Sequence, residues 1–516
     1  MAAYYQLLAS HALTKVGSKG WEFATPLLLL QFGPGGNSLF APTLFGLTVF
    51  ALKFVLGPIA GRWIDRAQRM HVVRVGIALQ AAGVLGAIAV LGLLRVLVGD
   101  EEQTSMPWHL LLAITACGVL EALGALISSV AVKKDWVPAI WAPTDPTLTA
   151  VNANMANIDL LAEIAGPLAA GAALQVLGNV SGFVVVGVAN VVTFGLELLL
   201  LRAVYVSNAQ LAAIKPVPPA GEPADKGGFG GLLNAWPVFA AHPSGIPLLV
   251  VSYGLLYFTV LSPHGVILTA YLQTRHLSPP ALAAFRAAGA LSGVAGMAFF
   301  RIATARVGLR NLASGHLWLL ALSVLAAAVS FGATHVHSAE PNADGLTTPM
   351  LLFLALVVVS RFGLYGFDLA VLQLQQVHVD EAYRGSVGAI ESSICSLGTA
   401  SLFVATLLTS SPDVHSFDFL VYASVSFVSS AALVYTLWVM LFHEHEHAHP
   451  LFEQHEGSAF PGAVHKHTSQ QQRDLEESTT RSHVHLHFHP PWQHTLDHLI
   501  GKADHEEHQH DYHRHG

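Results

Sequence analysis

Residues 179–205 read NVSGFVVVGVANVVTFGLELLLLRAVY, and this stretch decides the fold class. A helix needs about 20 mostly apolar residues to cross a lipid bilayer, so the run predicts a membrane-spanning helix. The composition of the chain agrees, because 53% of the 516 residues are hydrophobic and only 11% are charged. A typical soluble domain carries roughly 25% charged residues, so the chain is unsuited to a surface that faces water on all sides.

The same length criterion, applied along the chain, predicts twelve spans in two sets of six. Residues 215–231, KPVPPAGEPADKGGFGG, separate the sets and are typical of a flexible linker. Six plus six spans around a central linker is the arrangement of the major facilitator superfamily. We therefore predict an all-α membrane protein of that fold, with an N-terminal lobe (1–206), a cytosolic linker (207–243), a C-terminal lobe (244–442) and a tail (443–516). The predicted spans are 4–31, 42–65, 72–98, 107–132, 150–176, 179–205, 244–271, 279–304, 308–335, 349–377, 385–411 and 415–442.

The charge of the loops alternates along the chain. Basic residues follow the even-numbered spans, as in Arg62, Arg66 and Arg69 near the end of the second, whereas Gly99–Glu102 after the third span is acidic. Cytosolic loops carry the excess of Lys and Arg in membrane proteins. We therefore expect a multi-pass protein of the plasma membrane or an organelle membrane, with both termini in the cytosol.

The composition changes abruptly after Phe442, since residues 443–516 hold 18 of the 29 histidines. Such a biased segment predicts a disordered tail. Imidazole suits zinc, copper, nickel and iron, so the tail is a candidate for metal capture, or a low-complexity segment that binds metal incidentally. Basic residues are scattered singly, which argues against a nucleic-acid partner. The histidines predicted to capture metal are His443, His445, His447, His449, His483, His485, His487 and His489.

Acidic residues lie inside the predicted spans of the N-terminal half, where a charge costs about 2.5–3.5 kcal/mol on insertion scales. Asp159 and Glu163 are four residues apart and therefore share one helix face. Carboxylates suit divalent cations. The alternative is a structural salt-bridge network in which Lys15 and Lys19 neutralise the acids. The acids are Glu22, Glu121, Asp159, Glu163 and Glu197.

The C-terminal half carries Arg361, Asp368 and Glu391 within its predicted spans. Residues 262–265, Ser-Pro-His-Gly, should break the span 244–271 near mid-membrane, and broken helices free backbone groups to line a cavity. His264 and Glu391 are therefore a candidate site. The alternative is that His264 is an ordinary histidine at a helix end.

Residues 61–66, Gly-Arg-Trp-Ile-Asp-Arg, follow the second span and predict a gate. Asp65 and Arg66 could close the cytosolic face through ion pairs that break when the halves rock. Lys134 and Asp135, in the segment Lys-Lys-Asp-Trp at 133–136, are candidate partners. The alternative is an ordinary positively charged cytosolic loop.

Several segments together resemble the ferroportin family of cellular iron exporters, within the major facilitator superfamily. The most specific is RFGLYGFDL at 361–369, followed by Gln373-Leu374 and Arg384-Gly385. The resemblance runs in order from about residue 5 to 442 and excludes the tail. The other segments that carry it are GSKGWEF at 17–23, GRWID at 61–65, KKDW at 133–136, residues 152–159 and residues 190–197.

The resemblance implies a metal site in the N-terminal lobe. The family's ligand positions correspond here to Ser18, Glu22 and Asp159, of which only Asp159 keeps the family's residue type. Glu163 joins the expected ligands by its position. A second cation site is implied at Gln80, Asn190 and Glu197, and a gating role is assigned to Arg361 and Asp368.

In the C-terminal lobe, the family's cysteine and histidine positions correspond to Gly265 and about Leu402. We therefore expect no thiolate–imidazole site there, unless His264 and Glu391 rebuild one.

The implied function is export of a divalent metal, foremost iron(II), from the cytosol by alternating access, with proton coupling as an option. The alternatives are another divalent metal, a small organic molecule or chelator, and a metal-sensing membrane protein that transports nothing. No catalytic arrangement is present, so we expect no enzyme. We also expect no permanently bound cofactor, the metal ion as substrate, the bilayer as surroundings and a monomer.

The predicted topology has a direct test at residue 516. An epitope tag placed there should be reached by antibody only after intact cells are permeabilised, because twelve spans and a cytosolic N-terminus return the chain to the cytosol. Labelling of the tag in intact cells would refute this topology.

Overall fold

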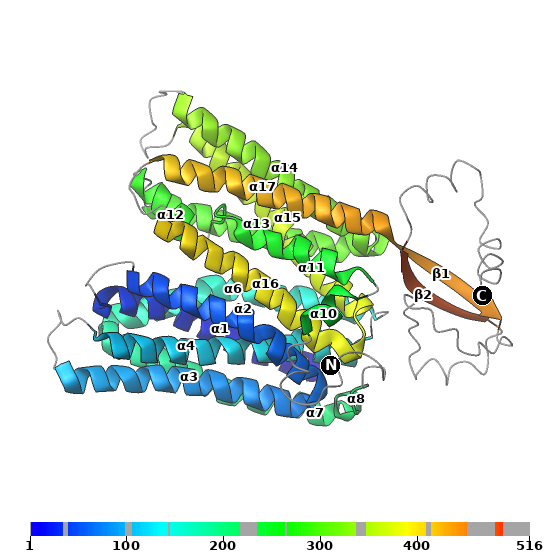
Figure 1. Cartoon of the computed structure of the whole chain (residues 1–516), viewed down its shortest axis with the longest axis horizontal. Coiled ribbons are helices and arrows are strands. Elements are labelled where there is room, and N and C mark those ends of the chain that lie inside the picture. The colour runs from blue at the N-terminus through cyan, green and yellow to red at the C-terminus, as the bar shows by residue number, and fades with distance from the viewer. Residues whose placement is uncertain are drawn as a thin grey trace.

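The computed structural model consists of long helices and one two-stranded ribbon (Figure 1). It describes residues 2–34, 40–98, 106–142, 145–216, 235–242, 244–263, 266–275, 277, 279–336, 347–408, 414–450 and 480–488. The first half of the chain forms α1 (Ala2–Phe32), α2 (Phe40–Arg66), α3 (Arg69–Val98), α4 (Trp108–Val130), a π-helix η1 (Ala131–Trp136), α5 (Val137–Ile140), α6 (Pro146–Leu177), α7 (Asn179–Ser207) and α8 (Ala209–Ala212).

The second half repeats this pattern of long helices. It contains α10 (Ala235–Ala240), α11 (Ile246–Leu255), the 3-10 turn η3 (Leu256–Phe258), α12 (Val266–Thr274), α13 (Pro279–Val307), α14 (Leu309–Val336), α15 (Thr348–His378), the 3-10 turn η4 (Glu381–Tyr383), α16 (Arg384–Leu408) and α17 (Val414–Leu441).

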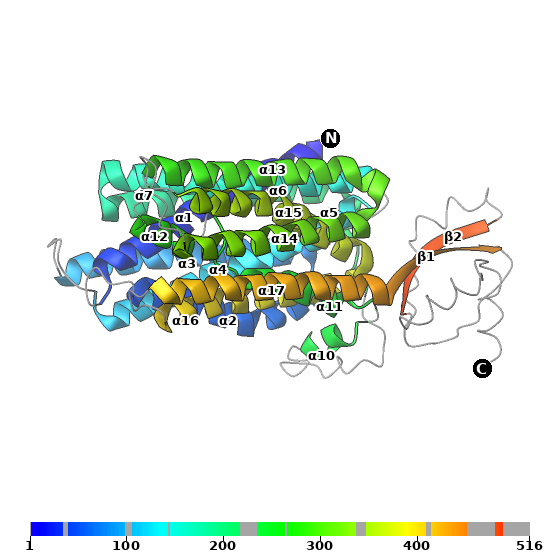
Figure 2. The same ribbon diagram turned by 90° about the horizontal axis from the view of Figure 1, so that it is seen from above.

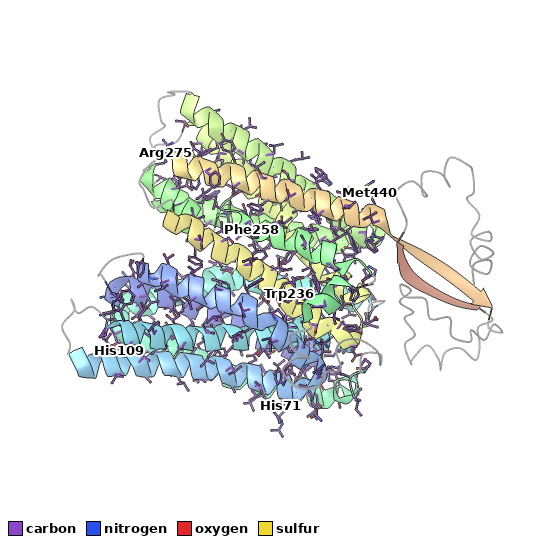
Figure 3. The ribbon with its side chains drawn as sticks, in the orientation of Figure 1. His71, His109, Trp236, Phe258, Arg275 and Met440 are labelled. Atoms are coloured by element: carbon purple, nitrogen blue, oxygen red, sulfur yellow. The ribbon has the colours of Figure 1, made fainter. Side chains whose placement is uncertain are left out.

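The helices pack around two hydrophobic cores, one in each half of the chain. Trp21, Trp136 and Phe183 belong to the first core, and Phe367 and Trp438 belong to the second. We call the end of the bundle where α1 begins and α17 ends the tail end, and the opposite one the far end. The two groups of helices diverge toward the far end and meet at the tail end (Figure 1). In Figure 3, His109 and Arg275 mark the far end, and His71 and Met440 mark the tail end.

The described helices follow the predicted spans closely. Ten of them are long and apolar enough to cross a membrane. Helix α1 has 31 residues but carries Lys15, Lys19 and Glu22 in its middle. The predicted span 244–271 is divided into α11, η3 and α12, and the break includes Pro263, as its sequence indicated. The protein is therefore a helical membrane protein whose first helix carries charged groups in its middle.

Two helix ends have a clear local cause. Asp145 caps α6, because its carboxylate accepts a hydrogen bond from the Thr147 amide at 2.7 Å, and Pro146 stands at the first helical position, where its missing N–H costs nothing. Gly178 joins α6 to α7 with φ +80°, a conformation that L side chains rarely adopt. This tight turn places α6 beside α7.

The π-helix η1 ends α4 with a widened turn. It holds Lys133, Lys134 and Asp135, and it leads without interruption into α5. Single π turns are frequent at functional sites. This one directs its three charged residues to different partners, as described below.

Small residues bring the two halves together along α2 and α16. A Cβ atom on Gly61 would lie 2.7 Å from Ala389 Cβ and 2.7 Å from the Gly385 oxygen. On Gly57 it would lie 2.2 Å from Ser393 Oγ. Glycine therefore allows the two backbones to approach each other at the tail end.

The tail differs from the predicted disorder in two segments. Strands β1 (Phe442–Pro450) and β2 (Thr480–Phe488) pair antiparallel and extend beyond the helix ends (Figures 1 and 2). Histidine alternates with other residues in both segments, and this period of two is the period of a strand. The expectation for the rest of 451–516 lies outside the described residues, as do His264 and Gly265.

The contact between α2 and α16 generates a stability prediction. Gly61→Val should separate the helices at the tail end, because the added methyls have no room, at a cost of about 1–3 kcal/mol. Spin labels at Gln210 and Arg306 should then report a longer inter-half distance. Gly195→Val is the matched control, since a Cβ there meets nothing within 4 Å. An unchanged distance in Gly61→Val would contradict the close packing.

Candidate functional site

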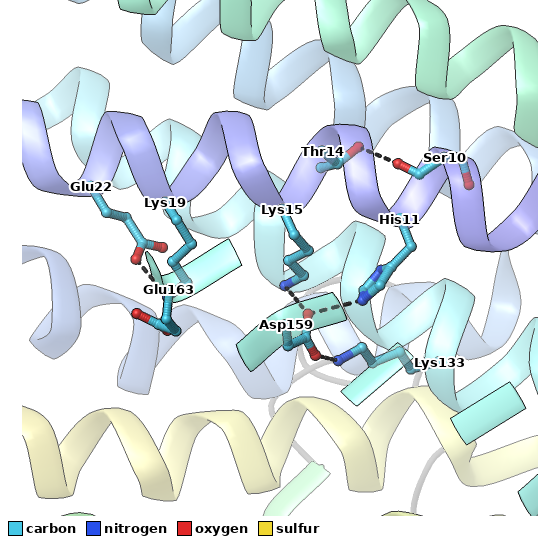
Figure 4. A network of polar contacts seen from close by, with 9 residues as sticks. All are labelled: Ser10, His11, Thr14, Lys15, Lys19, Glu22, Lys133, Asp159 and Glu163. Carbon is cyan, nitrogen blue, oxygen red and sulfur yellow. Dashed lines mark hydrogen bonds and ion pairs between the residues drawn. The ribbon is translucent and has the colours of Figure 1, made fainter. Parts of the chain in front are cut away.

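Asp159 on α6 is surrounded by nitrogen atoms. His11 Nε2 lies 2.9 Å and Lys15 Nζ lies 3.9 Å from its Oδ1 atom. Lys133 Nζ, from the π-helix, donates to Oδ2 (Figure 4). His11 and Lys15 are four residues apart and share one face of α1, so three elements converge on one carboxylate. We call this group the Asp159 cluster.

Further toward the far end, Lys19 bridges two carboxylates. Its Nζ atom lies 2.7 Å from Glu22 Oε2 on the same helix and 2.8 Å from Glu163 Oε1 on α6 (Figure 4). The side chains of Glu22 and Glu163 keep 55% and 39% of their surface exposed. We call this group the Lys19 bridge. The predicted alternative of a salt-bridge network is therefore present, and α1 and α6 are joined by alternating charges.

The predicted ligands Ser18, Glu22, Asp159 and Glu163 thus lie along one helix pair but have different partners. Glu22 and Glu163 share Lys19, whereas Asp159 has its own cluster. Ser18 is buried, and its hydroxyl has no hydrogen-bond partner among the described residues. In that part of the chain, no group of three or more His, Cys, Asp or Glu side chains is arranged to hold a metal ion.

The predicted second cation site has unsatisfied polar atoms. Asn190 is fully buried on α7, and neither its amide oxygen nor its nitrogen has a partner within the described ranges. Glu197 is also buried, and it follows Asn190 by seven residues on the same face of α7. One of its carboxylate oxygens likewise has no partner among the described residues. Gln80 on α3 donates to Ser128 Oγ at 3.1 Å. Buried oxygens without partners are suited to a cation, because leaving them unpaired is costly.

Asp65, predicted to close the cytosolic face through an ion pair, contacts the other half of the chain through hydrogen bonds instead. Its carboxylate accepts hydrogen bonds from the backbone amides of Gly385 at 2.6 Å and Ser386 at 2.9 Å, and from Ser386 Oγ at 2.5 Å. These donors lie at the start of α16, in the other half of the chain. Arg66, predicted alongside Asp65, is exposed at the end of α2.

The π-helix supplies two further connections at the tail end. Lys134 Nζ contacts Glu391 at 2.5 Å and Gln375 at 2.9 Å, both in the second half. Asp135 pairs with Arg69 at 3.1 Å and with Lys215 at 2.8 Å. A further ion pair, from Arg69 to Glu381 before α16, reaches the second half.

Arg361 and Asp368 make their contacts within the second half, although they were predicted to gate. Arg361 is buried and donates to the Leu261 carbonyl oxygen at 2.8 Å, beside the break between η3 and α12. Asp368 accepts a hydrogen bond from the Tyr253 hydroxyl. These contacts hold α15 against the broken helix, within the second half.

Of the candidate pair His264 and Glu391, the structure describes only Glu391. His264 lies outside the described residues, as stated above. Glu391 is occupied by Lys134 and by Gln375, whose amide donates to its other oxygen. Leu402 is half-buried on α16 and provides no ligand atom.

Sequence reasoning missed His11 and Lys133 as members of the site. The signal for His11 was its spacing, since residues 11, 15, 19 and 22 recur at helical intervals on one face. Lys133 had no such signal. It lies in the π turn at the end of α4, and its approach to Asp159 follows from the packing of that turn against α6.

The ribbon arranges histidines of the tail in register. His443 pairs with His487, His445 with His485, and His447 with His483. The register therefore places histidine opposite histidine at three positions of the ribbon.

Comparison with known proteins identifies relatives of the whole helical part. The family described as Ferroportin1 (FPN1) matches residues 1–225 and 229–428. Ferreportin from Bdellovibrio bacteriovorus is 32% identical over 445 residues, which cover 84% of this chain and 94% of that protein.

Solved structures give the same answer. A bacterial homologue of the iron transporter ferroportin in an outward-facing state matches with a TM-score of 0.72 and 31% identity, over 84% of this chain and 99% of that one. An inward-facing structure of a bacterial ferroportin homologue gives a TM-score of 0.57 and 29% identity, over 84% and 98%. Members of this family are transporters of metal and not enzymes. The chain belongs to the ferroportin family.

Proposed function

We propose that this protein exports iron(II) from the cytosol by alternating access, using twelve spans in the arrangement of the major facilitator superfamily. The observation that carries the proposal is the Asp159 cluster. It places a carboxylate inside the spans, between α1 and α6, in a chain of the ferroportin family. Ionisable groups at membrane depth mark ion pathways.

The proposed ligands are Asp159, Glu22 and Glu163, with Ser18 as a weaker contributor. They support binding of a hard or borderline divalent cation, since all of them offer oxygen. His11 is added to this set, because its imidazole already contacts Asp159. Protonation of the carboxylates on the side of release would couple the export to protons.

The closed tail end supports assignment of this structure to an outward-facing state. Asp65, Lys134 and Arg69 connect the halves at that end, and α1 and α17 have their tail-side ends there. The higher TM-score with the outward-facing structure agrees. After iron is released outside, these contacts between the two halves would have to break for the tail end to open. We assign the tail end to the cytosol on the alternation of loop charge.

A second cation at Gln80, Asn190 and Glu197 is part of the proposal. The unpaired buried oxygens on α7 support it. An ion held there would stabilise the N-terminal group of helices without being transported.

The preference for a metal over an organic cargo needs a separate test. The carboxylates already have cationic partners, and this observation keeps a small organic molecule or chelate as the second candidate. Proteoliposomes supplied with iron(II), cobalt(II), manganese(II) or zinc(II) should show uptake of the free ions, with chelated iron excluded. Uptake of the chelate alone would support the second candidate, and no transport of either would indicate a metal receptor.

Asp159→Asn should reduce iron(II) transport at least a hundredfold, because the substitution removes the charged ligand and leaves Lys133 and Lys15 to repel the ion. The measurement is uptake into proteoliposomes, with monodispersity and the melting temperature checked first. Asp159→Glu should restore part of the rate. Asp145→Asn is the matched control on the same helix, since asparagine caps a helix as well as aspartate. Transport at the unaltered rate in Asp159→Asn would reject Asp159 as a ligand.

The tail is proposed to collect cytosolic metal for export. A chain ending at Glu444 should keep its maximal rate but need more metal to reach half of it, because the tail raises the local metal concentration. A full-length chain with its tail histidines replaced by asparagine controls for length and should behave like the deletion. The benefit of the tail should fade below about pH 6.5, where imidazole is protonated. Unchanged metal dependence after deletion would leave the tail without this role.

A further inference from the structure

We propose that Lys19 is a tethered competitor of the transported cation. Its ammonium group occupies the position between Glu22 and Glu163 that a divalent ion would take, and the ion must displace it to bind. The inference rests on the proposed function, since it assumes that these carboxylates receive metal.

The geometry of the Lys19 bridge is that of a cation held between two carboxylates. One nitrogen atom lies 2.7 Å and 2.8 Å from oxygens that come from different helices. Both carboxylates remain partly exposed, at 55% and 39%, whereas Lys19 is 23% exposed. The two carboxylates are therefore not enclosed by protein, and the lysine is the group that fills the place between them.

The bridge is not needed to hold α1 against α6. The two backbones touch at Gly20 and Gly166, where a Cβ atom on Gly166 would lie 2.7 Å from the Gly20 nitrogen. A Cβ atom on Gly20 would lie 3.2 Å from the Gly166 oxygen. This backbone contact fixes the crossing of the helices one residue from Lys19. The side chain of Lys19 is thus free to leave without separating them.

The balance of charge favours replacement of Lys19 by a divalent ion over binding of the ion beside it. Lys19 with Glu22 and Glu163 sums to one negative charge, whereas a divalent ion in its place makes the carboxylate pair neutral. The neighbouring Asp159 cluster, with Lys15 and Lys133, carries one positive charge when His11 is neutral. A divalent ion that bound beside Lys19 without displacing it would therefore add to a positive surplus. In a low-dielectric site two cations held at the same carboxylates repel each other strongly, so the ion and the ammonium group compete for the place between Glu22 and Glu163.

The expected consequence concerns affinity. Lys19 lowers the apparent affinity of the pair for every divalent cation, because each one competes with the same tethered ammonium. A transporter benefits from this, since an ion that binds too tightly leaves too slowly. Lys19 is thus a residue that sets affinity, and it is not itself a ligand.

The test is binding of manganese(II) to the purified full-length protein, followed by the loss of its free electron paramagnetic resonance signal. Manganese(II) prefers oxygen ligands, and the tail is the same in every variant, so differences report on the helices. Lys19→Gln should lower the Kd about tenfold, which corresponds to about 1.4 kcal/mol. Lys19→Met, which keeps the length of the stem, should behave alike. Lys19→Arg keeps the cation and should bind close to the unaltered protein.

Arg202→Gln removes one positive charge from an exposed position on α7 and serves as the matched control. It should leave the Kd unchanged, which separates local displacement from a general electrostatic effect. Weaker or unchanged binding in both Lys19→Gln and Lys19→Met would overturn the inference. The assignment of Glu22 and Glu163 as ligands has its own test. Intact manganese binding in the double variant Glu22→Gln, Glu163→Gln would reject that assignment.

Discussion

The structure depends on the neutralisation of charge inside an apolar bundle. A lone carboxylate in a low-dielectric region is costly, and a partner of opposite charge with good geometry reduces that cost. The facing surfaces of α1 and α6 meet this constraint with alternating acids and bases, from the Asp159 cluster to the Lys19 bridge. At the tail end, the ion pairs of Lys134 with Glu391 and of Arg69 with Asp135 follow the same rule, whereas Asp65 is satisfied by backbone amides and a hydroxyl.

Under the proposed function, this rule also explains how the carboxylates that would receive the cation persist without it. Lysine and histidine side chains act as internal counter-ions, so the carboxylates stay compatible with the membrane when no metal is bound. The energy of the site is then a difference between two sets of ion pairs. Such a difference is small, and a small difference suits a protein that must both take up and release its substrate.

The sequence predicted the helices well because their cause is local. Apolar length, loop charge and the proline at 263 indicated the spans and the broken helix, and Asp65 was recognised from its loop. The pairings of side chains were harder to predict from the sequence, because they depend on which helices become neighbours. Lys133 lies in the π turn and contacts Asp159 on another helix, and Arg361 donates to a carbonyl oxygen in its own half. The paired segments of the tail show a strand period in the sequence, which the bias toward histidine obscured.

The π-helix carries a consequence for the length of the chain. Consecutive residues on one turn face different parts of the protein, because Lys133 contacts Asp159 in the first half and Lys134 contacts Glu391 in the second. A π turn holds more residues than the α-helical turn of 3.6 residues, so removal of one residue between 131 and 136 would change the direction of Lys133 relative to that of the residues that follow it. The number of residues in this turn is therefore constrained as tightly as their identity, and an insertion or deletion here is equivalent to several simultaneous substitutions.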